Sequence, residues 1–444
     1  MLLRCSKEAA TNSICSHMTE IVILLGRILN RSCTVEPTDK SSVEATKLWM
    51  RMAIDSVPLT MIHNHDLLLL YLVRLIRNTS PLNESTCLSA LKFTVQLASH
   101  PESRGPIMQY PGLIDVIINR SSTDECSKVI TECVKIIESL LRDAQNRAEY
   151  LNRPRSLAPL INQCRGRDAK ACLHAARALK QLSLEANFRQ KLSRPEILGA
   201  LIRLVIIPSS SDRIKLECLQ TMANVISVKT AEHFMAYSGL LKELAKVATC
   251  SFLSDQVRSL AARAIKRLST HVHPRHASHT ELFEAIETMS SAKGRLVRLW
   301  TARALVEQSL LAGSSFLMVR TSHVMDTFIR LAACDHIDVR AATFEALANL
   351  AQEPANARRI STNTVILELL VRTVHESHDI ESEEARRQAV RAVLLMASNH
   401  SSTKRVAKHL GLVSCLSRYG TSDDGDFELK QAALNGVVFL APMI

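Results

Sequence analysis

The sequence predicts an all-α protein built from one helical unit that recurs along the chain. Two observations predict this class: 444 residues contain only 12 glycines and 13 prolines while 47% are apolar, and one helix pattern returns at a nearly constant spacing. Scarcity of the residues that interrupt helices favours packed helices. The length alone would also allow two or three ordinary domains.

The repeated pattern is a helix with a small residue, replaced once by Leu219, seven positions before a mostly apolar anchor and a mostly apolar residue three positions before it. Successive anchors are 40 to 46 residues apart. The anchors are Met52, Leu97, Leu140, Leu182, Ile226, Leu268, Gln308, Leu350, Met396 and Leu440. Positions −7, −3 and 0 fall on one helical face, so we expect them to form a buried stripe.

Two further features define the rest of each unit. A polar turn ending in arginine follows several anchors, as at Arg104, Arg147, Arg189 and Arg358. A glycine precedes several second helices, at Gly112, Gly239 and Gly411, where we expect it to supply a left-handed turn. Each unit should therefore contain a short first helix, a second helix and a long third helix.

These units set the predicted boundaries. Residues 1–54 hold N-terminal helices and an atypical first repeat, and residues 55–444 hold the array. Its approximate units are 55–99, 100–142, 143–184, 185–228, 229–270, 271–311, 312–353, 354–398 and 399–444.

The three-helix unit of about 43 residues, with its arginine turn and its glycine before the second helix, resembles the armadillo repeat. Val297-Arg298 and Asp338-Val-Arg340 look more like the related HEAT repeat. The resemblance implies an armadillo-type solenoid, a right-handed α-α superhelix of about ten three-helix repeats. Its third helices would line one concave face.

In peptide-binding armadillo proteins such as the importin-α family, third helices carry a tryptophan and, one turn later, an asparagine that grips an extended peptide. Those positions correspond to −5 and −1 here. Position −1 has one asparagine, Asn349, and position −5 has no tryptophan. We therefore expect no recognition of basic import signals.

Position −5 instead carries lysine or arginine in seven of ten units, interrupted by Thr221, Glu345 and Asn435. We call these cations the basic row: Lys47, Lys92, Lys135, Arg177, Arg263, Arg303 and Arg391. Such a row would attract acidic chains, and it resembles the basic groove of the catenin family. The alternative is that these side chains cover the apolar stripe with their stems and leave their charges in water.

The function predicted from the basic row and Asn349 is a non-enzymatic protein-binding scaffold or adaptor that takes an acidic or phosphorylated extended segment. The formal net charge of +12 leaves an alternative, in which the same groove binds an anionic membrane surface or nucleic acid. We expect a cytoplasmic or nuclear location, since no signal-peptide pattern opens the chain. No apolar run is long enough to span a membrane.

Catalytic and cofactor motifs are missing from the sequence. It contains no G-x-G-x-x-G, G-x-x-x-x-G-K-[ST], H-E-x-x-H or G-x-S-x-G, so we expect no enzyme, no catalytic residues and no cofactor. The loop with His271, His273, His276 and His279 could ligate a metal, but no thiolate is near and only Glu281 offers a carboxylate, so we expect a solvated loop and no metal.

The last third helix, Leu434–Ile444, is apolar. Since an open stack end needs a polar cap, we expect either further sequence or a partner contact at this C-terminal end.

Overall fold

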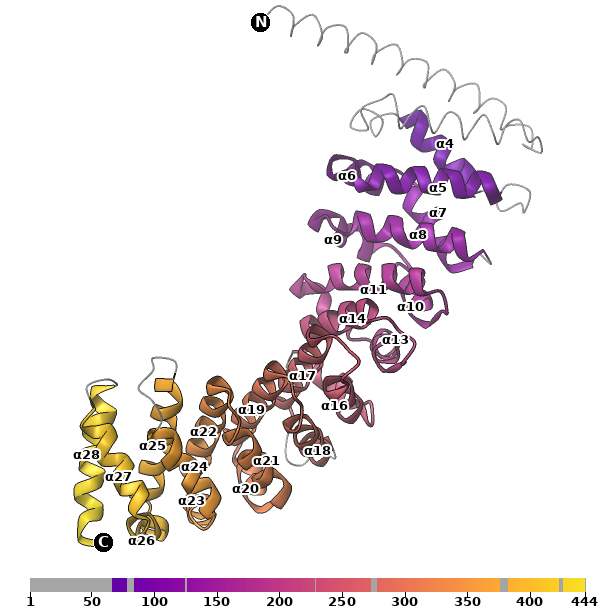
Figure 1. Cartoon of the computed structure of the whole chain (residues 1–444). Helices are drawn as coiled ribbons and strands as arrows, with labels where there is room; N and C mark the ends of the chain where they lie inside the picture. Colours follow the sequence, from indigo (N-terminus) through magenta and orange to yellow (C-terminus); the bar gives the residue numbers. More distant parts are fainter. Residues whose placement is uncertain are drawn as a thin grey trace, which may run out of the picture. The chain divides into compact units, whose positions relative to one another are not determined.

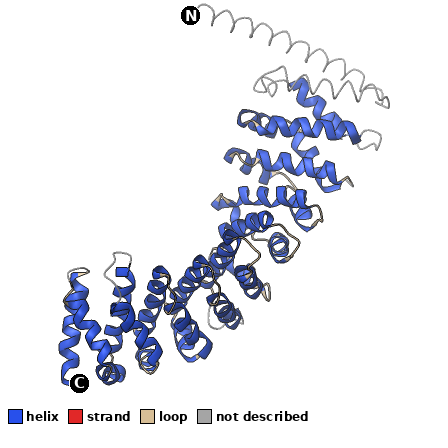
Figure 2. Ribbon diagram, in the orientation of Figure 1, coloured by secondary structure: helices blue, strands red, loops and turns tan. Residues whose placement is uncertain are grey.

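The structure is a computed structural model that describes residues 66–77, 84–123, 126–227, 229–272, 278–375, 382–422 and 426–443. Within these ranges every regular element is a helix and no strand occurs, which confirms the all-α class (Figure 2). The predicted segment 1–54 and Lys47 lie outside the described residues. The contacts divide the chain into two compact units, which we call unit 1 (1–224) and unit 2 (225–444) and describe separately.

Three kinds of helix follow one another along the chain (Figure 1). The short first helices are α6 (Pro101–Gln109), α9 (Ala144–Asn152), η2 (Ala186–Phe188) with α12 (Arg189–Leu192), α15 (Ala231–Met235), α20 (Ala312–Arg320), α23 (Pro354–Ile360) and α26 (His400–Lys408). The second helices are α4 (Asp66–Arg77), α7 (Leu113–Thr123), α10 (Leu157–Arg165), α13 (Pro195–Ile206), α16 (Leu240–Thr249), α18 (Ser278–Ser290), α21 (Ser322–Ala332), α24 (Thr364–His375) and α27 (Leu410–Gly420). The third helices are α5 (Glu84–Ser99), α8 (Ser127–Leu140), α11 (Ala169–Ser183), α14 (Asp212–Val225), α17 (Asp255–Ser269), α19 (Arg295–Ser309), α22 (Ile337–Ala351), α25 (Glu383–Ser398) and α28 (Phe427–Leu440), which is followed by η4 (Ala441–Met443).

Helices of one kind pack against the next helix of the same kind. In unit 1, α5 packs on α8 and α8 on α11, while α4, α7, α10 and α13 contact each other in sequence. In unit 2, α17, α19, α22, α25 and α28 form such a series, as do α16, α18, α21, α24 and α27. Each unit is therefore a layered stack in which a helix buries its apolar face against its own successor.

The predicted stripe is buried. In the described third helices every anchor is buried, and so is position −7; position −3 is buried except at Val437, which is partly exposed. Gln308 is the polar exception among the anchors. Its amide donates to the carbonyl of Ser269 and accepts from the hydroxyl of Ser314, which satisfies the group inside the stack.

The arginine after the anchor closes the third helix. Arg104 donates to the carbonyls of Ala98 and Ser99 at 3.0 Å, and Arg147 donates to that of Leu141 at 2.9 Å. The last carbonyls of a helix have no partner within the helix, so a guanidinium that folds back satisfies them. Arg104 and Arg147, together with Arg189, which donates to the carbonyl of Ser183 at 3.4 Å, thus act as C-terminal caps, whereas Arg358 is exposed.

Gly112 and Gly239 have φ angles of 78° and 79°, as the left-handed turn requires. The expectation for Gly411 is wrong, because it lies inside α27 and has no positive φ. A Cβ there would stand 3.1 Å from the side chain of Val371, so this glycine permits close packing on α24.

The repeat between α17 and α18 also differs from the expected three-helix unit, because its described residues form no first helix.

Candidate functional site

The candidate site is the exposed side of the third helices, which we call the third-helix face. In unit 1, Lys92 is exposed, and no partner of its side chain is found among the described residues. The Nζ of Lys135 lies 3.8 Å from a carboxylate oxygen of Glu132. Thr221 is buried and donates to the carbonyl of Glu217. Position −5 of the third helices in unit 1 therefore differs from repeat to repeat in exposure and in charge.

Arg177 meets a buried carboxylate. Its Nε donates to Glu217 at 3.3 Å, and Lys180 Nζ lies 2.6 Å from the other oxygen of the same carboxylate. The Glu217 side chain is only 9% exposed. Since a buried carboxylate needs compensating charge, Glu217 engages two cations that would otherwise face outward.

Glu138 forms a second buried carboxylate site in unit 1. His174 Nδ1 lies 2.5 Å from it, and Arg142 donates to it at 3.1 Å. Burial acts to raise the pKa of Glu138, but the hydrogen bonds from His174 and Arg142, together with the charges of His174 and Arg177, lower that pKa below its ordinary value. The carboxylate is therefore held in its charged form beneath the third-helix face.

In unit 2 two members of the basic row lie over one aromatic ring. Arg263 of α17 is 5.6 Å and Arg303 of α19 is 5.3 Å from the ring centre of Trp300, which lies on α19. The indole N–H donates to Ser259 Oγ at 3.2 Å and so fixes the ring. Guanidinium groups over an aromatic face keep their N–H groups available at the ring's edge. Two successive third helices thus present paired donors around one tryptophan.

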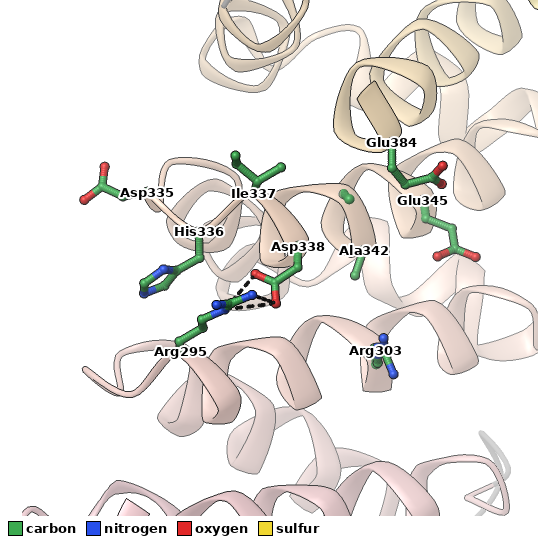
Figure 3. A pocket seen from close by; sticks show the side chains of 10 residues that line it. Arg295, Arg303, Asp335, His336, Ile337, Asp338, Ala342, Glu345 and Glu384 are labelled. Atoms are coloured by element: carbon green, nitrogen blue, oxygen red, sulfur yellow. Dashed lines mark hydrogen bonds and ion pairs between the residues drawn. The ribbon is translucent and has the colours of Figure 1, made fainter. Parts of the chain in front are cut away.

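A hollow of about 600 Å³ follows on α19, α22 and α25 (Figure 3). Arg295 and Asp338, which both line it, form an ion pair at 3.0 Å, and Arg303 also lines it. Its remaining charged lining residues are acidic: Asp335, Glu345 and Glu384. The surface therefore changes from basic around Trp300 to acidic around Glu345, where the basic row is interrupted.

The last two candidate residues each form a side-chain hydrogen bond within the fold. Asn349 donates to Ser309 Oγ at 3.2 Å, and Arg391 donates to Gln388 at 3.5 Å. Sequence reasoning missed Trp300, because the importin-type comparison looked for tryptophan only at −5. Its position three residues before Arg303, on the same helix face, is the signal that could have found it.

The histidine loop is only partly described, since His273 and His276 lie outside the described residues. His279 is buried, bonds to Ser314 Oγ at 2.9 Å and meets the edge of the Phe283 ring. His271 is partly buried, which lowers its pKa. The described residues contain neither a cluster of three metal-ligating side chains nor a helix both long and apolar enough to cross a membrane.

Several apolar side chains of the C-terminal helix are exposed. Phe427 and Val438 are 78% and 72% exposed, and Phe439 and Met443 are also exposed. No described helix follows them.

No protein-family model matches this chain, and no curated protein matches it either. Among solved structures, a crystal structure of an engineered protein from the Northeast Structural Genomics Consortium has a TM-score of 0.62 at 18% identity, covering 94% of this chain and 98% of that one. A second engineered protein from the same consortium has a TM-score of 0.43 at 20% identity, covering 55% of this chain and 97% of that one. The first likeness shows a shared fold.

Proposed function

We propose that the chain is a non-enzymatic protein-binding scaffold: an armadillo-type solenoid of about ten repeats that binds an acidic or phosphorylated extended segment on its third-helix face. The constant spacing of the anchors, the buried stripe and the stacking of like helices support the architecture. The proposed location is cytoplasmic or nuclear.

The observation that carries the binding proposal is the pair Arg263 and Arg303 around Trp300. A carboxylate or phosphate at the edge of the ring would receive hydrogen bonds from two guanidinium groups that cation–π contacts already hold in place. Holding the donors before binding lowers the entropy that association costs.

The neighbouring hollow favours one orientation of the bound segment. Its carboxylates, from Asp335, Glu345 and Glu384, would repel an acidic side chain and favour a neutral or basic one. The proposed segment therefore places acidic residues over α17 and α19 and a neutral or basic residue over α22. In unit 1, considered by itself, Lys92 is the exposed cation that an acidic residue would contact, since Arg177 is already paired with Glu217.

Tryptophan fluorescence provides the test, because the chain has two tryptophans, Trp49 and Trp300. In a Trp49→Phe background, Trp300 reports binding of a peptide of alternating glutamate and glycine. The double variant Arg263→Gln/Arg303→Gln should weaken binding about tenfold or more.

The matched control is Lys242→Gln/Lys246→Gln on the second helix α16 of the same unit, which should stay within about twofold of wild type. Equal affinity in wild type and in the arginine double variant would contradict the proposal. Tighter binding of a labelled DNA duplex or of anionic vesicles, with a steep loss of affinity in salt, would instead support the general electrostatic alternative.

A further inference from the structure

A second hollow, of about 490 Å³, lies in unit 1, away from the third-helix face. It is formed where α9 passes into α10 and where α12 passes into α13. No residue of a third helix lines it. The lining residues are Leu151, Arg153, Arg155, Ser156, Leu157, Ala158, Ile161, Lys191, Arg194 and Glu196.

Four of these residues are cations, and they differ in how they are engaged. Arg153 is used within the fold: it donates to Asp115 at 3.1 Å, to Glu149 at 2.9 Å and to the carbonyl of Met108 at 2.8 Å. Within the described part of the chain, no ion pair or hydrogen bond engages the side chains of Arg155, Lys191 and Arg194, and all three are exposed.

Arg155 occupies a backbone position where other repeats have glycine. It has a φ of 59°, and the turn is closed by Ser156 N donating to Arg153 O. The corresponding turns, closed by Leu113 N to Tyr110 O and by Leu240 N to Tyr237 O, have Gly112 and Gly239 at that place.

An arginine in the left-handed region is strained, whereas glycine is not. Of the three turns, only the one with Arg155 carries this backbone strain, and it is also the one that places a cation at this hollow.

The rest of the lining is apolar. Leu151 is buried, and Leu157, Ala158 and Ile161 are partly exposed toward the hollow. None of the large exposed apolar side chains of the described residues lies in the lining segments, so nothing there would insert into a lipid bilayer. Three exposed cations against the single carboxylate of Glu196 suit a doubly charged anion better than a lone carboxylate.

We propose that this hollow binds the phosphate of a phosphorylated serine or threonine side chain of a partner protein. Arg155, Lys191 and Arg194 contact the phosphate, and an apolar neighbour of the phosphorylated residue packs on Leu157 and Ile161. This site is independent of the function proposed for the third-helix face, because the two surfaces share no residue.

Calorimetric titration of the full chain tests the site with three probes: inorganic phosphate, the capped tripeptide alanine-phosphoserine-leucine, and its unphosphorylated form. Arg155→Gly removes the guanidinium and relieves the backbone, so it should leave the unfolding midpoint unchanged or higher while weakening phosphopeptide binding roughly three- to tenfold. Lys191→Gln/Arg194→Gln should weaken it further. Lys128→Gln, an exposed cation on α8, is the matched control and should have no effect.

Phosphopeptide binding that is lost in these variants but kept in Arg263→Gln/Arg303→Gln supports the proposal. It is overturned if wild type does not prefer the phosphorylated tripeptide, or if Arg155→Gly and the double variant bind like the Lys128→Gln control. It is also overturned if these cations govern binding only to vesicles of phosphatidylcholine and phosphatidylserine.

Discussion

The cations on the third helices have different neighbours in the two units. In unit 1, from α8 to α14, the carboxylates Glu138 and Glu217 are buried beneath the face and bind His174, Arg142, Arg177 and Lys180. In unit 2, Arg263 and Arg303 meet the ring of Trp300, while the carboxylates gather in an open hollow. The charge of Arg177 is thus compensated by a carboxylate of the next third helix, whereas Arg263 and Arg303 keep theirs beside an aromatic ring.

The largest effect is expected at Glu217. Glu217→Ala should lower the free energy of unfolding by about 2–3 kcal/mol, because it leaves two half-buried cations without their carboxylate. Urea unfolding measures this. The control Glu243→Gln, which removes an exposed i,i+3 pair with Lys246, should change stability by less than about 0.5 kcal/mol.

Neutralising Glu217 without removing its side chain should also change the affinity for the acidic peptide. Glu217→Gln should raise the affinity for the acidic peptide, since Arg177 and Lys180 are released toward the face. An unchanged affinity would show that these cations do not face the ligand even when they are unpaired.

A smaller effect is expected at Trp300 in unit 2. Trp300→Ala should lower the free energy of unfolding by about 2 kcal/mol. It should also weaken acidic-peptide binding without removing a charge, because Arg263 and Arg303 lose the ring that holds them. Fluorescence anisotropy of a labelled peptide measures the affinity. Trp300→Phe, which keeps an aromatic face, should recover part of it; equal loss in both variants would argue against the ring as the organiser.

The smallest effect is a pH dependence confined to unit 1. Because folding lowers the pKa of Glu138, its carboxylate stabilises the protein above its ordinary pKa of 4.5, and this contribution is lost as the pH falls below that value. Wild type should exceed Glu138→Gln by about 1 kcal/mol at pH 7, and the difference should vanish in acid. Urea unfolding at several pH values checks this, and a gap that persists in acid would contradict it.

Much of the fold follows from local sequence. The spacing of the anchors predicted the buried stripe. Residues 3, 4 and 7 positions apart share one face of a helix, and the same contacts recur in each repeat of a stack. The failure at Gly411 has a tertiary cause: close packing on Val371 gives the glycine a different role. Gln308 at an apolar position is tolerated because Ser269 and Ser314 supply its hydrogen bonds.

The candidate site was only partly predictable. The sequence placed Lys92, Arg177, Arg263 and Arg303 at one helix position, but Trp300 and the buried glutamates were not identified from the pattern. Arg177 and Glu217 are 40 residues apart, and Arg263 and Trp300 are 37 apart, so each pair meets only through stacking of successive third helices.

The helical period, the buried stripe and the shared register of the basic row could all be predicted from the sequence, because these depend on spacing within one helix. Which of those cations keep an available charge depends on tertiary contacts. These contacts come from side chains of the next repeat, and the register does not specify whether those side chains are buried, charged or aromatic.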